Sequence, residues 1–175
     1  MKHSKVRTGR TIAAARPLSH LDTEGRARMV DVSGKRATSR TARARAIVTL
    51  GRAAFAALDA ATNRKGDALA VARLAGIQAA KRTAEWIPLC HPLAFDSVAV
   101  NLTPRPARLA VEITTEVKGA GKTGYEMEAL VSATAAALAL YDMCKAVDKG
   151  IEIREITLLE KTGGKSGSWR RGKAR

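Results

Sequence analysis

The segment from residue 125 to residue 147 constrains the fold most, because it predicts a long helix with almost no polar face. Its apolar residues fall on one stripe at helical spacing and also beside that stripe. The stripe consists of Ala133, Ala136, Leu140, Cys144 and Val147, whereas Leu138, Tyr141 and Met143 lie off it. Such a helix must be buried on more than one side. In a chain of 175 residues we expect the second side to face another subunit, which predicts a homo-oligomer.

Two charged residues, Asp142 and Lys145, interrupt this apolar segment three positions apart. They make the segment a poor membrane span, and we expect no membrane association. Burying a carboxylate and an ammonium costs several kcal/mol per ion before any compensation. One interpretation is therefore an ion pair at a partly open end of the helix. The other is a buried functional pair that touches a ligand and has shifted pKa values.

The rest of the chain alternates predicted strands with predicted helices. Strands are expected at residues 46–50, 97–102, 109–117 and 151–158. Helices are expected at residues 53–61 and 68–86, the second with Asp67 near its start and Pro88 after its end. In the last strand the apolar phase shifts, which indicates a kink or a bulge. Because the strands come in pairs with long helices between them, the order predicts an α+β fold, an antiparallel sheet with helices on one face.

The net charge of +15 and the two cysteines limit the kind of protein. A strongly basic chain favours anionic partners, which are nucleic acid, acidic lipid or a polyphosphate. Much of the charge lies at the ends, so we expect a flexible basic arm over residues 1–18 and a basic tail over 169–175, around one domain from 19 to 168. Cys90 and Cys144 form no CxxC motif and no secretory signal is visible, which favours a cytoplasmic protein.

Two glycine-lysine stretches resemble phosphate-binding loops without matching their pattern. A P-loop needs a glycine five residues before its Gly-Lys pair, and those positions hold Glu116 and Leu159. Gly121-Lys122-Thr123 nevertheless precedes a helix, with Thr123 and Glu126 at the spacing of a capping box. Backbone N–H groups in two such basic loops suit a triphosphate. The alternative is an ordinary turn and a flexible tail.

The loop Leu89-Cys90-His91-Pro92 places a histidine beside a cysteine. As an isolated signal, a surface histidine is as good an interpretation as a catalytic one. Cys90, His91 and Cys144 lack the ligand spacing of a zinc site, so no metal site is predicted. A Cys90 nucleophile would have no visible base partner in the sequence.

Seven segments together resemble the MoaC family, the cyclic pyranopterin monophosphate synthases. They are Met29–Ser33, Lys65–Asp67, Ala75–Lys81, Leu89–Leu93, Thr123–Leu130, Tyr141–Ala146 and Lys161–Gly167. The resemblance runs in order from about residue 19 to 168, so that range is expected to be the MoaC-like catalytic domain. Tyr125 departs from the family pattern, which more often has valine there, and is expected to change the packing beside the substrate region.

The resemblance implies a ferredoxin-like subunit with additional helices. It implies a hexamer, a trimer of dimers, with active sites at subunit interfaces. The implied lyase reaction converts 3′,8-cyclo-7,8-dihydroguanosine 5′-triphosphate to cyclic pyranopterin monophosphate and pyrophosphate. This step belongs to molybdenum cofactor (molybdopterin) biosynthesis and follows a radical SAM cyclase. No tightly bound cofactor is implied, although Mg²⁺ with the triphosphate is an open alternative.

The resemblance also implies a role for individual residues. Asp142, Lys65 and Lys145 resemble the catalytic residues, and a lysine beside another cation is expected to have a lowered pKa. The expected substrate contacts are Leu89, Cys90, His91, Glu126, Met127 and Glu128. Candidates for phosphate contacts are Arg40, Lys161 and Lys165, because arginine binds phosphate in bidentate fashion and lysine acts as a point charge.

A different function class, a basic nucleic-acid-binding module, would explain the charge of +15. It would leave the charged pair in the apolar helix and the glycine loops without a role. With two Phe, two Tyr and two Trp, the chain also lacks an aromatic platform for base stacking. A structural oligomer that had lost activity is the third interpretation. The residues that argue against it are Lys65, His91, Glu128, Asp142 and Lys145.

Overall fold

A computed structural model describes residues 20–58 and 67–172 of the chain. The predicted arm over 1–18 and the candidate Lys65 lie outside the described residues. The sheet is built from β1 (Thr38–Thr49), β2 (Ser97–Arg105), β3 (Ala110–Gly121), β4 (Glu152–Thr162) and β5 (Trp169–Arg170). The helices are α1 (Arg52–Ala56), α2 (Ala68–Lys81), α3 (Thr83–Trp86), α4 (Glu126–Cys144) and a short 3₁₀ turn, Pro106–Arg108.

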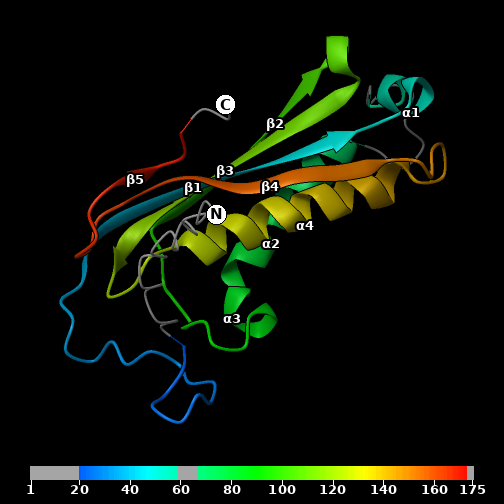
Figure 1. The fold of residues 1–175 in the computed structure, drawn as a ribbon. Helices are drawn as coiled ribbons and strands as arrows, with labels where there is room; N and C mark the ends of the chain where they lie inside the picture. The colour runs from blue at the N-terminus through cyan, green and yellow to red at the C-terminus, as the bar shows by residue number, and fades with distance from the viewer. Residues whose placement is uncertain (1–19, 59–66, 173–175) are drawn as a thin grey trace, which may run out of the picture.

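The five strands form one antiparallel sheet in the order β2-β3-β1-β4-β5. The crossover from β1 to β2 contains α2, and the crossover from β3 to β4 contains α4, which gives the ferredoxin-like arrangement that the resemblance implies. Both long helices cover the same face of the sheet (Figure 1). The predicted α+β class and the predicted single helical face are therefore confirmed.

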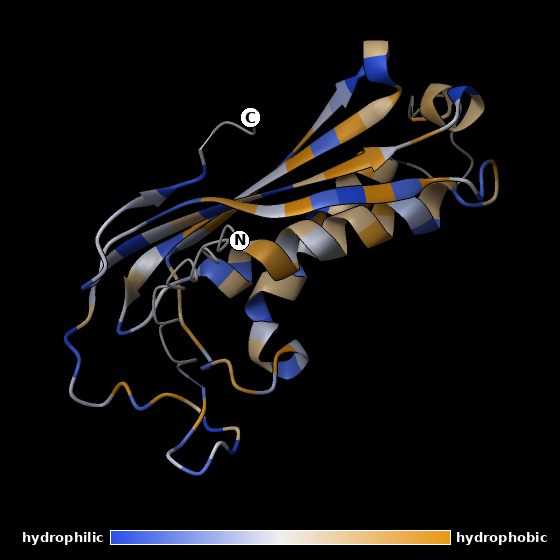
Figure 2. Cartoon of the chain, viewed as in Figure 1, coloured by the Kyte–Doolittle hydropathy of each residue, from blue (hydrophilic) through white to orange (hydrophobic). Residues whose placement is uncertain are grey.

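Small side chains allow the two layers to approach each other closely. On β1, Ala42, Ala44 and Ala46 alternate with half-buried polar residues and are fully buried. The facing positions of α4 are also mostly alanine, and apolar residues follow the buried side of the helix (Figure 2). Between α2 and α4, a Cβ atom added to Gly76 would lie 3.0 Å from the Ser132 carbonyl oxygen. Because the core has few aromatic residues, it is packed densely by bringing the backbones of the helices and the sheet close together.

A second side of α4 is already buried by α2 of the same chain, so the helix does not need another subunit to cover that side. The helix packs on β1, β3 and β4 with one side and on α2 with another. Leu138, which lies off the main stripe, is 49% exposed. By length and composition α4 could cross a membrane, yet 56% of its apolar window is buried inside the structure, as in the core helix of a folded domain.

Several element boundaries differ from their predictions. The expected helix over 68–86 breaks at Arg82, whose φ of −117° is not helical, and continues as α3. The expected capping box is wrong, because Tyr125 occupies the N-cap position of α4 and no side chain caps it. Asp67 does cap α2, since its carboxylate accepts a hydrogen bond from Ala70 N at 2.9 Å.

The bulge predicted near residues 151–158 is confirmed. The register between β1 and β4 shifts between Arg43 and Ala44 and again between Arg45 and Ile47. Glu155 has a φ of +52°, a left-handed conformation that places an extra residue in the strand. At the end of the chain, part of the expected tail continues the sheet as β5, where Arg170 pairs with Glu160 at 2.9 Å.

Candidate active site

A cavity of about 690 Å³ lies where the loop after α3 meets the N-terminus of α4. Its lining includes five of the predicted substrate contacts, which are Leu89, Cys90, His91, Glu126 and Met127. Ile87, Pro88 and the turn residues Thr123 and Gly124 complete much of the wall. The volume is within the range of small-molecule sites, and the lining combines apolar walls with a few polar groups. We call this space the loop cavity.

Tyr125 holds the two sides of the loop cavity together. The residue is 1% exposed, and its hydroxyl donates a hydrogen bond to the Ala94 carbonyl oxygen at 2.9 Å. The ring also meets Phe95 edge-on, with centroids 6.3 Å apart. The departure from the family pattern at this position therefore ties the start of α4 to the segment that follows the Leu89–Pro92 loop.

Glu128 is buried behind the loop cavity. It is 2% exposed, and its Oε2 atom has no hydrogen-bond partner in the part of the chain that the structure describes. It lines a separate cavity of about 410 Å³ together with residues 92–94, α3 and the end of α2. Burial raises the pKa of Glu128 to about 7, and the Glu126 carboxylate adds to this shift.

The Cys90 thiol lies close enough to Glu128 to be affected by its charge. Burial raises the pKa of Cys90, and the Glu128 carboxylate adds to the rise, whereas a backbone hydrogen bond from His91 opposes it. A thiol with a raised pKa stays protonated near neutrality. Cys90 is therefore suited to contact a ligand as a neutral group and is poorly suited to act as a nucleophile.

Two of the three predicted phosphate contacts lie at the edge of the loop cavity. Lys161 of β4 approaches the Glu126 carboxylate to 3.5 Å, and its side chain is 20% exposed. Arg40 of β1 is half-buried and donates from Nε to the Gly121 carbonyl oxygen at 2.8 Å. Lys165 is exposed, in the loop that follows β4. The resulting positive charge beside the cavity favours an anionic ligand.

The predicted catalytic pair is exposed in the single chain, which agrees with the interpretation of an ion pair at a partly open helix end and corrects the interpretation of a buried pair. Lys145 Nζ and Asp142 Oδ1 are 2.6 Å apart, with side chains 52% and 61% exposed. The hydrogen bond from Lys145 to Asp142 raises the pKa of the lysine, the opposite of the expected shift. The pair lies where α4 ends, and the sheet and α2 cover the other sides of that helix.

The candidate residues thus form two groups at opposite ends of α4. Asp142 follows Glu126 by sixteen residues, which is about 24 Å along a helix. The loop cavity contains neither member of the pair. One small ligand cannot touch both groups of the same chain.

These positions fall within a stretch that known proteins share. The profile of the MoaC family matches residues 29–164. The chain belongs to the MoaC family. The match spans all the predicted site residues except Lys165, which lies immediately after it.

Three relatives of this MoaC chain carry the name cyclic pyranopterin monophosphate synthase. The protein of Chloroflexus aggregans is 55% identical over 154 residues, which cover 88% of this chain and 93% of the relative. The protein of Rhodospirillum rubrum is 54% identical over 157 residues, with 90% and 95% covered. The protein of Parvibaculum lavamentivorans is 54% identical over 157 residues, with 90% and 98% covered.

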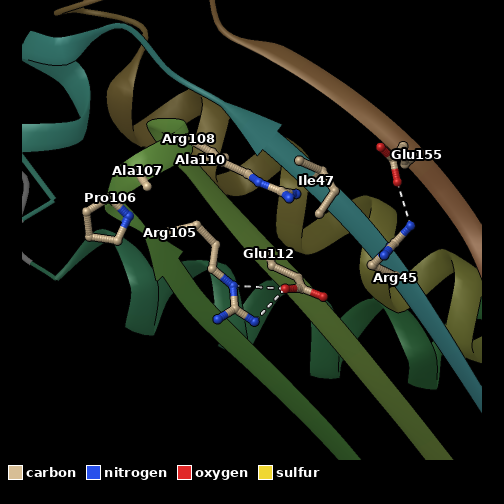
Figure 3. Close-up of a pocket in the computed structure, with 9 residues that line it drawn as sticks. All are labelled: Arg45, Ile47, Arg105, Pro106, Ala107, Arg108, Ala110, Glu112 and Glu155. Carbon is tan, nitrogen blue, oxygen red and sulfur yellow. Dashed lines mark hydrogen bonds and ion pairs between the residues drawn. The ribbon is translucent and has the colours of Figure 1, made fainter.

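Another cavity, of about 480 Å³, lies on the face of the sheet opposite the helices (Figure 3). Arginines line it, but carboxylates neutralise two of them. Arg45 pairs with Glu155 at 2.5 Å and Arg105 pairs with Glu112 at 2.7 Å. None of the residues shared with the MoaC motifs lines this cavity, so we do not assign the active site to it.

The structure adds residues that sequence reasoning missed. Ile87 and Pro88 line the loop cavity, and Ser166 accepts a hydrogen bond from Lys161 Nζ at 2.6 Å. The Gly-Lys-Ser stretch did mark this region, but as a phosphate loop and not as a support for Lys161. Within residues 20–58 and 67–172, no group of three or more His, Cys, Asp or Glu side chains could hold a metal ion.

Proposed function

We propose that this chain is a cyclic pyranopterin monophosphate synthase of molybdenum cofactor biosynthesis. It would convert 3′,8-cyclo-7,8-dihydroguanosine 5′-triphosphate to cyclic pyranopterin monophosphate and release pyrophosphate. The observation that carries the proposal is the loop cavity, where Cys90, His91 and Met127 line one space beside the cations Arg40 and Lys161. The names of relatives that are 54–55% identical over most of the chain support the same activity.

In this proposal the loop cavity receives the purine-derived ring. Its apolar walls would pack against the ring, and His91 and the neutral Cys90 thiol offer hydrogen bonds to ring heteroatoms. Glu128 lies outside the loop cavity, in the separate cavity, but its charge affects the Cys90 thiol, and with a pKa near 7 it can hold or release a proton at neutral pH. Such a group suits a reaction that opens and rebuilds a ring through several proton transfers.

The triphosphate would lie along the cationic edge of the cavity. Lys161 donates to Ser166 Oγ at 2.6 Å and lies 3.5 Å from Glu126, and its ammonium has three donors, so a phosphate oxygen could accept from it as well. Arg40 and the exposed Lys165 would add positive charge to that edge. Mg²⁺ accompanying the triphosphate would be part of the substrate and would need no protein site.

Asp142 and Lys145 would enter the site from a second subunit. They lie about 24 Å along α4 from the loop cavity, so a composite site between subunits brings both groups to one substrate. Burial in such an interface would desolvate the pair, which is exposed in one chain, and desolvation lowers the pKa of a lysine. We infer a hexamer with interface sites, and we assign Lys65 to the same catalytic group.

We further propose that the enzyme works in the cytoplasm, downstream of a radical SAM cyclase that supplies its substrate. The reaction requires the 3′,8 bond to be present already, since no step proposed for this site forms it.

The test is incubation with the cyclised guanosine triphosphate, followed by measurement of pyrophosphate and of the fluorescent pterin formed on oxidation. The unmodified chain should form both products. Asp142→Ala should abolish product formation and leave the assembly size by light scattering unchanged. Near-normal turnover by that variant would falsify the catalytic assignment, and no turnover by the unmodified chain would refute the proposed function.

A further inference from the structure

The loop after β4, residues 163–167, packs against both cations at the edge of the loop cavity. Its sequence is Gly-Gly-Lys-Ser-Gly, and a hydrogen bond from Gly167 N to the Gly164 carbonyl oxygen at 3.0 Å closes it. Both glycines at its start have positive φ values, +84° for Gly163 and +75° for Gly164. We call this segment the bracing loop.

On one side the bracing loop confines the Arg40 guanidinium. Arg40 Nε donates to the Gly121 carbonyl oxygen at 2.8 Å, and Nη2 donates to the Lys122 carbonyl oxygen at 3.3 Å. A Cβ atom on Gly164 would overlap Arg40 Nη1 and come within 2.8 Å of Cζ. The guanidinium is thus held between the turn before α4 and the backbone of Gly164. Its Nη1 atom makes no hydrogen bond within the described residues, which leaves donors for an anion.

On the other side the same loop holds Lys161. The Lys161 ammonium donates to Ser166 Oγ at 2.6 Å and lies 3.5 Å from the Glu126 carboxylate. Without Ser166, the nearby carboxylate would be the remaining partner of the ammonium. Ser166 therefore holds the charge of Lys161 away from full pairing with Glu126.

We propose that the bracing loop positions Arg40 and Lys161 for a polyphosphate, with Gly164 and Ser166 as its positioning residues. The glycine-lysine motif then acts by holding the Arg40 and Lys161 side chains in place, and not by donating backbone N–H groups to the phosphate. The inference rests on the proposed function, because that function supplies the triphosphate. The inference adds to the proposed function a reason why residue 164 is a glycine and residue 166 carries a hydroxyl.

The test compares Gly164→Ala with Gly167→Ala. Both positions have positive φ, +75° and +63°, so both substitutions strain the backbone in a similar way. Only a Cβ at 164 meets Arg40, and a Cβ at 167 has no atom within 4 Å. The clash at 164 is with the end of a flexible side chain, so the expected response is displacement of Arg40 and not unfolding. Gly163→Ala would not be a suitable control, because its Cβ would overlap the Ser39 carbonyl oxygen and would disturb the backbone.

The measurement is the Kd for inorganic tripolyphosphate by titration calorimetry on the full chain. Gly164→Ala should weaken binding by about tenfold, the size of one charge-assisted contact. Gly167→Ala should stay within about twofold of the unmodified protein. In an Arg40→Ala background, adding Gly164→Ala should change the Kd by less than about twofold, because the two changes remove the same contact. Equal Kd values for the two alanine variants, or an undiminished effect of Gly164→Ala without Arg40, would overturn the proposal.

Ser166→Ala tests the second cation and still decides the proposal if Gly164→Ala does not fold. It should weaken tripolyphosphate binding about threefold, and this effect should vanish in a Lys161→Ala background. An unchanged Kd for Ser166→Ala would overturn the role of the loop at Lys161.

Turnover measurements separate this inference from the proposed function. With the cyclised nucleotide, Gly164→Ala should raise KM and leave kcat within about twofold, as expected for lost phosphate binding. A fall in kcat with KM unchanged would contradict a positioning role. If the unmodified chain did not turn over the nucleotide but tripolyphosphate binding followed the pattern above, the proposed function would fail and the bracing loop would stand.

Discussion

At the scale of single residues, Glu128 shows how burial changes the chemistry of a carboxyl group. Glu126 and Glu128 both lie in the first turn of α4, yet Glu126 reaches Lys161 whereas Glu128 has an unpaired buried oxygen. Desolvation disfavours the charged form, which raises the pKa of Glu128 from 4.5 to about 7. Burial thus allows the Glu128 carboxyl to gain or lose a proton near neutral pH.

This shift predicts a pH-dependent stability. Below pH 4.5 the carboxyl is protonated in both the folded and the unfolded chain and contributes no difference. Between pH 4.5 and about 7 the unfolded chain loses the proton first, so the free energy of unfolding falls as the pH rises. Above that window the buried charge costs about 3 kcal/mol. Glu128→Gln should therefore be more stable than the unmodified chain at pH 8.5, by about 2–3 kcal/mol in denaturant unfolding.

The control is the same pair of proteins at pH 4.5, where the stability gain from Glu128→Gln should be close to absent. A gain of equal size at both pH values would mean that the carboxyl is not protonated in the folded chain. Loss of stability at pH 8.5 would mean that the Glu128 carboxylate has an ionic partner.

At the scale of elements, the contact between α2 and α4 depends on the absence of a side chain at Gly76. A Cβ there would lie 3.0 Å from the Ser132 carbonyl oxygen, 3.2 Å from Ala136 Cβ and 3.2 Å from Val100 Cγ2. Gly76→Ala should destabilise the fold by about 1–3 kcal/mol, because the added methyl must push the helices apart. This would outweigh the gain in helix propensity of about 1 kcal/mol.

The measurement is the denaturation midpoint of Gly76→Ala against that of Gly34→Ala. Gly34 has no atom within 4 Å of a built Cβ and no positive φ, so its substitution should shift stability by less than about 0.5 kcal/mol. A Gly76→Ala variant at least as stable as the unmodified chain would show that the helix contact can absorb a methyl group.

At the start of α4, tertiary contacts determined the helix end in place of the capping box that the local sequence predicted. The spacing of Thr123 and Glu126 predicted a reciprocal cap, but a Cβ on Gly124 would overlap the Glu126 carboxylate, which folds over that glycine and reaches Lys161. The buried Tyr125 fixes the backbone at the N-cap through its bond to Ala94. Contacts with residues about 30 positions earlier and later in the chain therefore decided the helix start.

At the scale of the whole molecule, the separation of the two candidate groups predicts complementation between defective subunits. His91→Ala would damage the loop cavity and Asp142→Ala would damage the pair at the far end of α4. Each variant alone should be inactive. Mixed assemblies of the two, coexpressed and purified through different tags, should recover about a quarter of the activity, the share of interface sites that receive both intact groups.

A matched control is the mixture of Asp142→Ala with Lys145→Ala. Both residues belong to the catalytic pair at the same end of α4, so every interface site would contain one damaged member of that pair and activity should stay absent. No recovery in the first mixture, with mixed assemblies verified by mass, would exclude a composite site. A monodisperse monomer by light scattering would exclude it as well.

The sequence by itself determined the order of the main strands and long helices, although the break between α2 and α3 and the strand β5 were not predicted. Period-two and period-3.6 patterns reflect only the side on which each segment is buried, so the strands, the helices, the bulge at Glu155 and the cap at Asp67 could be predicted locally. The MoaC motifs likewise identified the residues of the candidate site. The structure brought Leu89, Cys90, His91, Glu126 and Met127 together as expected.

Only the tertiary structure decided which groups are buried and which are neighbours. The charged pair at Asp142 and Lys145 looked buried because its helix is apolar, but α2 covers that helix elsewhere and leaves the pair exposed. Glu128 looked like a second cavity residue and lies behind the cavity instead. Burial and pKa depend on atoms brought in from distant parts of the chain, and a local pattern of residue types carries no information about those atoms.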